Sequence, residues 1–90
     1  MTESELDAAL STAVGVVAAF REQGNGTLSR AALADYLWTA VVEVGGPANL
    51  VEALAALVLA VSSLLAEQNG VSLGVVLNAV GIAMAERSAS

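Results

Sequence analysis

Few side chains in this sequence are suited to chemistry. The chain of 90 residues has no histidine, cysteine or lysine, and its three basic residues are Arg21, Arg30 and Arg87. Without histidine it lacks the commonest general base and metal ligand, and without cysteine it can form no disulfide and no reactive thiolate. Without lysine, Schiff-base chemistry and the lysine of phosphate-binding P-loops are also excluded. Carboxylates and hydroxyls are the reactive groups that remain.

Two pairs of carboxylates and one pair of serines have spacings that catalysis could use. Glu3 and Asp7 are four residues apart, and Glu52 and Glu67 share one side of an expected helix; general acid–base catalysis needs such groups close together. Glu3 and Asp7, however, suit the positive start of a helix, and Glu52 and Glu67 lie about four helical turns apart. The serines of Ser62-Ser63 have no histidine, lysine or cysteine to activate them. We therefore predict a protein that is not an enzyme and has no catalytic residue.

The segment from Arg21 to Ala32 is the sharpest local motif. It contains Gly24-Asn25-Gly26-Thr27-Leu28, and it resembles the calcium-binding loop of EF-hand proteins, with Gly26 at the tight turn and Leu28 at the apolar position after it. Such a loop needs an acidic first ligand and a closing bidentate glutamate. Arg21 and Ala32 occupy these two positions. The resemblance therefore concerns the shape of the loop, and we predict neither a calcium site nor any other metal or cofactor.

Composition points to contact with other molecules. The hydrophobic share is 57%; with glycine added and tyrosine left out it is about 65%, whereas ordinary domains have about 45–50%. One small domain cannot hide that much apolar surface, so further faces should be buried against other chains or against lipid, and we favour an oligomer. A net charge of −6 with scattered arginines argues against binding to nucleic acid or anionic lipid.

Helix signals divide the sequence into four elements. Thr2-x-x-Glu5 is a capping-box pattern, Ser29 and Ser72 are suitable N-caps, and Pro47 fits the first turn of a helix. Glycines and asparagines follow each of the first three segments. The expected helices cover about residues 3–23, 30–44, 47–68 and 73–87. The predicted fold is all-α: a single domain over residues 1–90, a four-helix bundle built from two antiparallel helix–loop–helix hairpins.

Apolar spacing defines an expected inward face for the first three helices. For the first helix this face is Leu6, Ala9, Leu10, Ala13, Val17 and Phe20. For the second it is Leu33, Leu37, Ala40, Val41 and Val44. For the third it is Leu50, Leu54, Leu57, Val58, Val61, Leu64 and Leu65, with Glu52, Ala56, Ser63 and Glu67 outside.

Further apolar residues lie off these inward faces and predict an interaction surface. They are Trp38 and Val42 in the second helix and Val75, Ala79 and Ile82 in the fourth. The fourth helix is apolar nearly all round, which is typical of a helix buried on two sides, and tryptophan is favoured at the centre of contacts. We expect these five residues to form the contact of a homodimer or of another protein complex. An unusually tilted bundle that covers them internally is the alternative.

Two other functions remain open. A small membrane-active protein of the holin type would explain the hydrophobicity. Residues 53–66 are free of charge but too short to span a bilayer, and residues 68–85 contain polar residues and three glycines. A carrier of a small apolar ligand would use a cavity among Leu54, Val58, Leu77 and Met84.

We expect a cytoplasmic, non-catalytic interaction or regulatory module. The acidic start Thr2-Glu3-Ser4-Glu5 does not resemble a signal peptide, and the Ala/Val/Gly-rich composition fits a bacterium or its phage.

Overall fold

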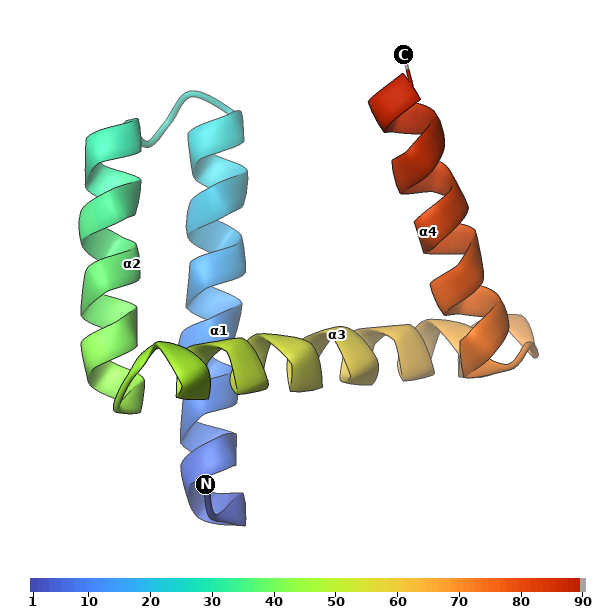
Figure 1. The fold of residues 1–90 in the computed structure, drawn as a ribbon, viewed down its shortest axis with the longest axis horizontal. Helices are drawn as coiled ribbons and strands as arrows, with labels where there is room; N and C mark the ends of the chain where they lie inside the picture. Colours follow the sequence, from blue (N-terminus) through green and yellow to red (C-terminus); the bar gives the residue numbers. More distant parts are fainter. Residues whose placement is uncertain (90) are drawn as a thin grey trace. The chain divides into compact units, whose positions relative to one another are not determined.

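The computed structural model describes residues 1–89, and these residues fold as four α-helices without strands. The helices are α1 (Glu3–Gly24), α2 (Arg30–Val44), α3 (Pro47–Asn69) and α4 (Leu73–Ala89). α1 and α2 run antiparallel side by side and form the first helix–loop–helix hairpin, while a short turn joins α3 to α4 (Figure 1). The expected all-α class is confirmed.

Side chains next to the helix starts satisfy free backbone amides there. The hydroxyl of Thr2 accepts a hydrogen bond from the amide of Glu5 (3.2 Å), and the Glu5 carboxylate accepts one from the amide of Thr2 (3.3 Å). This is the predicted capping box. Ser29 accepts from the amide of Ala32 at the start of α2 (3.1 Å), and Ser72 from the amide of Val75 in α4 (3.3 Å). Local sequence chemistry thus sets where these helices begin.

The turn after α2 depends on a glycine. Gly45 has φ 89°, in the left-handed region that a side chain disfavours. The amide of Gly45 donates to the Val42 carbonyl (3.2 Å), and the amide of Gly46 donates to the Val41 carbonyl (2.9 Å). The Asn49 side chain donates to the Val44 carbonyl (2.9 Å). These bonds fix the exit of α2 and the start of α3 within a few residues.

The chain divides into two compact units, Met1–Leu57 and the residues from Val58 onward. The N-terminal unit contains α1, α2 and the first part of α3. Two clusters of small side chains form its core: Ala9, Ala13 and Ala53 in one, and Val16, Ala40 and Leu50 in the other. Because alanines dominate, the helix backbones can approach closely.

The face that α1 buries differs from the expected one. Ala9 and Ala13 are buried as predicted, but Val17 and Phe20 are 52% and 53% exposed. Val16 and Ala19 are buried in their place. Helical spacing is compatible with either set of residues facing the core. The set that is buried has the smaller side chains, and these permit close contact with α2 and α3. In α2 the expected side is correct, since Leu33 and Ala40 are buried there.

The C-terminal unit consists of the last part of α3 and α4. Among its described residues, Ser62, Ala66 and Val76 are buried. Four residues expected in the inward arc of α3 are instead about half exposed or more: Val58 55%, Val61 57%, Leu64 57% and Leu65 46%. Within this unit α4 is the one helix available to cover α3, and it covers a narrow strip. The expected broad inward arc is therefore wrong beyond Leu57.

Candidate interaction surfaces

The α2 part of the predicted surface faces solvent. Trp38 and Val42 lie one turn apart, and their side chains are 71% and 75% exposed. The core side of α2 is elsewhere on the helix, with Leu33 and Ala40 buried and Leu37 packed beside them. α2 thus carries a second apolar face that the N-terminal unit leaves uncovered.

Trp38 contributes to two shallow hollows of about 430 and 390 Å³. The first is lined by Trp38, Thr39, Val42 and Glu43. The second is lined by Ala34, Leu37, Trp38, Val41 and Pro47. Both are open, mostly apolar depressions, unlike the concave sites that enclose most of a small molecule.

The α4 part of the predicted surface is also exposed. Val75 and Ile82 are both 53% exposed, and Ala79 is exposed between them. Val75 and Ala79 line an open hollow of about 350 Å³ in the C-terminal unit. We call it the α4 hollow, and its lining is Leu65, Asn69, Val71, Val75, Val76, Ala79, Val80 and Ala83. Asn69 is its one polar side chain, and the Nδ2 atom of Asn69 donates to the Leu65 carbonyl (2.8 Å).

The five predicted residues fall into two groups. Trp38 and Val42 belong to the N-terminal unit, and Val75, Ala79 and Ile82 to the C-terminal unit. Each group is continuous on its own helix. That both groups serve one contact stays a prediction.

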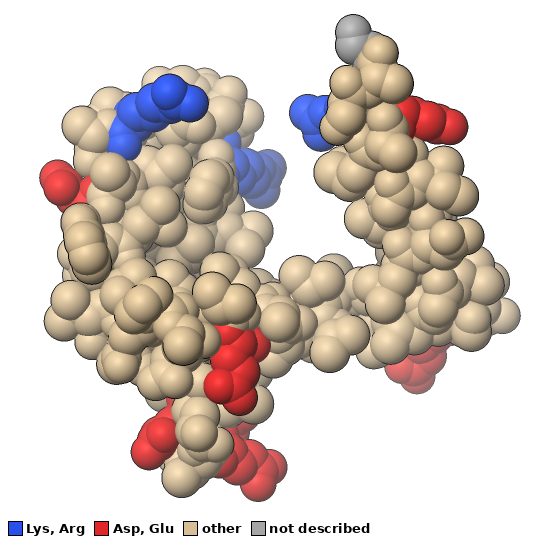
Figure 2. All heavy atoms as spheres, in the orientation of Figure 1, with Lys and Arg blue, Asp and Glu red and all other residues tan. Residues whose placement is uncertain are grey.

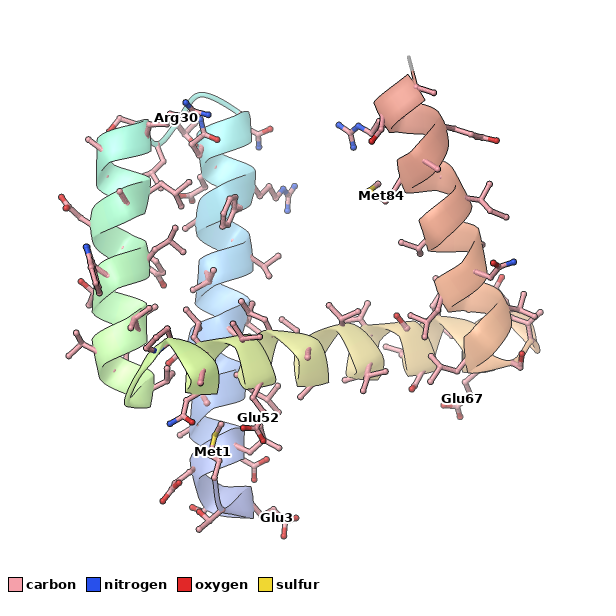
Figure 3. All side chains as sticks on the ribbon, viewed as in Figure 1. Met1, Glu3, Arg30, Glu52, Glu67 and Met84 are labelled. Atoms are coloured by element: carbon pink, nitrogen blue, oxygen red, sulfur yellow. The ribbon has the colours of Figure 1, made fainter. Side chains whose placement is uncertain are left out.

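Charged residues are sparse on the C-terminal unit. From Val58 onward they are Glu67, Glu86 and Arg87, and the surface of α4 before its last turns is uncharged (Figure 2). Met84, labelled on α4 in Figure 3, is 51% exposed. Of the residues suggested for a ligand cavity, Val58 and Leu77 are also exposed, while Leu54 packs against the core of the N-terminal unit.

A groove of about 420 Å³, lined by polar and apolar residues, was not predicted. It lies in the N-terminal unit and is lined by Glu5, Ala8, Ala9, Thr12, Val42, Glu43, Val44, Gly45 and Asn49. The side chains of Glu5 and Asn49 both hydrogen-bond to the backbone, Glu5 at the start of α1 and Asn49 at the end of α2. The groove brings together segments that are distant in the sequence, and no local motif marks it.

Residues 1–89 contain no group of three acidic side chains placed to hold a metal.

The hydroxyls of the serine pair have separate environments. Ser62 is 7% exposed within the C-terminal unit, and Ser63 faces solvent. With no histidine, cysteine or lysine in the sequence, neither hydroxyl has the usual activating partner.

α3 is long and apolar enough to cross a membrane. It has 23 residues, and its most apolar window has a mean hydropathy of 2.0 with 17% of that window buried. The charge-free run counted in the sequence is shorter, because Glu52 and Glu67 bound it. Core helices of soluble proteins share this length and composition, so these two properties alone do not distinguish a membrane span.

Comparison of the chain with protein-family models, curated proteins and solved structures found no match.

Proposed function

We propose that this protein is a non-catalytic interaction module that associates with a second copy of itself. The observation that carries the proposal is the exposure of Trp38 and Val42, the two most exposed large apolar side chains described. They lie one turn apart on a regular helix and beside two apolar hollows.

The energetic reason is the area of the indole. A tryptophan side chain buries about 150–250 Å² in a core or interface, so covering the exposed 71% of Trp38 would remove roughly 100–180 Å² from water. At about 25 cal/mol per Å² this favours contact by about 2.5–4.5 kcal/mol before the costs of association. A residue of this size is a reasonable centre for an interface.

Replacement of Trp38 by glutamate tests the proposal. A carboxylate buried in an apolar contact is costly, so Trp38→Glu should give a folded, helical monomer by light scattering and circular dichroism, while the wild type is a dimer. Val14→Glu is the control, because Val14 is an exposed α1 residue, 53% accessible, and the change adds the same charge. Val14→Glu should remain dimeric. A wild type that is monomeric at high micromolar concentration contradicts the proposal.

A membrane-active role is the second candidate, and the hydropathy of α3 favours it. Flotation with vesicles of phosphatidylcholine separates the two, because this neutral lipid does not repel an acidic protein. An interaction module should stay in the unbound fraction. Co-flotation of most of the protein would favour the membrane role instead.

A further inference from the structure

The C-terminal unit is too small to supply its own core. From Val58 onward the chain has 33 residues, and units below about 40 residues usually need disulfides, metals or association to fold stably. The sequence has no cysteine, and residues 1–89 offer no cluster of metal ligands. Ser62, Ala66 and Val76 are the buried residues described there. Burial of its apolar surface therefore requires contact with further protein surface.

The uncovered apolar area matches that of a dimer interface. Eleven large apolar side chains of this unit are about half exposed, namely Val58, Leu59, Val61, Leu64, Leu65, Val71, Val75, Leu77, Val80, Ile82 and Met84. At roughly 100 Å² for each fully buried side chain, they leave about 550 Å² of apolar surface. A standard interface buries about 800 Å² on each partner, of which roughly 450–520 Å² is apolar. This unit alone carries enough for one such interface.

The distribution of charge makes the C-terminal unit a favourable place for a second contact between two copies, in addition to the contact at Trp38 and Val42. The residues up to Leu57 include seven carboxylates and two arginines, a formal charge of −5, whereas Glu67, Glu86 and Arg87 give the rest a charge of −1. Contact between two N-terminal units alone brings like charges together. A further contact between the C-terminal units adds apolar burial with little added repulsion.

We propose, building on the self-association above, that the same dimer has a second contact in which α4 of each copy lies in the α4 hollow of the other, and that a stable dimer needs both contacts. The second half of α3 and α4 from two copies then form an intermolecular four-helix bundle. The contact is reciprocal, as expected for a two-fold dimer. Ala79 and Ala83 line the hollow, and their small side chains let the two α4 helices approach closely. The larger Val75 and Val80 also line it and pack against the other copy.

Cysteine cross-linking tests this arrangement in the full-length chain, which has no cysteine of its own. Around a two-fold axis, the residue nearest the axis lies beside its own counterpart. Ala79→Cys or Ala83→Cys should therefore form a disulfide-linked dimer under mild oxidation, since cross-linking requires Cα atoms within about 7 Å. Ala18→Cys on the exposed side of α1 is the control and should remain monomeric on a non-reducing gel.

Two glutamate variants at equally exposed valines measure how much the α4 hollow contributes to dimerisation. Val75 and Val14 are both 53% exposed, so Val75→Glu and Val14→Glu add the same charge at equal exposure, the first inside the α4 hollow and the second on α1. Val75→Glu should weaken dimerisation at least about a hundredfold by analytical ultracentrifugation, and Val14→Glu should change it less than threefold. The cysteine variants keep the test valid if Val75→Glu unfolds α4.

The outcomes separate this inference from the proposed function. A wild-type dimer in which neither cysteine variant cross-links overturns the intermolecular bundle and leaves self-association through α2 intact. A monomeric wild type with a stable α4 overturns both. A cross-linked dimer with both Ala79→Cys and Ala18→Cys would indicate non-specific association and also overturns the bundle.

Discussion

Single residues at the helix starts act through local hydrogen bonds, and their contribution can be measured. The hydroxyl of Ser29 accepts from the amide of Ala32, so Ser29→Ala should lower the free energy of unfolding by about 1 kcal/mol. Ser11→Ala is the control, because Ser11 lies exposed inside α1, where alanine is at least as favourable. Urea denaturation followed by circular dichroism measures both. Equal effects of the two variants would mean that the Ser29 cap contributes no stability.

Residue identity also decides the metal chemistry of the first loop. Arg21 and Ala32 stand where an EF-hand has its first and last carboxylates. We expect isothermal titration with calcium chloride to show no saturable binding tighter than about 1 mM. A saturating isotherm with micromolar affinity would contradict this prediction. Glu22→Gln and Asp35→Asn would then show which nearby carboxylate takes part.

The serine, proline and glycine signals predicted the beginnings and ends of the helices, because those signals act within a few residues. The buried side of each helix depends on partners that are distant in the sequence. In α1 two stripes had suitable spacing, and contact with α2 and α3 selects the one with Val16 and Ala19. Sequence periodicity could not choose between them.

Stability measurements can check which residues of α3 belong to the core. Leu50 is 7% exposed and packs in a cluster with Val16 and Ala40. Leu50→Ala should therefore lower the free energy of unfolding by about 2–5 kcal/mol. Val61 is 57% exposed, so Val61→Ala should change it by about 0.5 kcal/mol or less at concentrations where the protein is monomeric. A large loss with Val61→Ala would place it in a buried contact.

The candidate surface was predictable in part. Trp38 and Val42 lie off the inward side of α2 in the sequence, and both side chains are exposed while Leu33 and Ala40 are buried. In α4 the pattern does not separate two sides, since Val80 is about as exposed as Val75 and Ile82. That these residues form a contact stays a prediction. The α4 hollow and the groove at Glu43 each combine two or more helices. No pattern within one helix could reveal them.

At the level of the whole molecule, the formal charge of −6 should oppose association of identical copies. Salt screens such repulsion, with a Debye length of about 10 Å at 0.1 M. We therefore expect dimerisation to become tighter by a small factor, about two- to fivefold, between 20 and 200 mM sodium chloride. Sedimentation equilibrium at both salt concentrations measures this. Weaker association at high salt would mean that ion pairs between copies dominate the contact.

The position of Trp38 has a consequence for how this protein can be observed. It is the sole tryptophan, and its indole is 71% exposed in the folded chain. Its fluorescence emission should therefore resemble that of a solvated indole both before and after unfolding, and a denaturation curve recorded by that emission should be nearly flat. If a partner covers the indole, the emission maximum should move to shorter wavelength as concentration rises. The same side chain would then serve as an intrinsic optical probe of association.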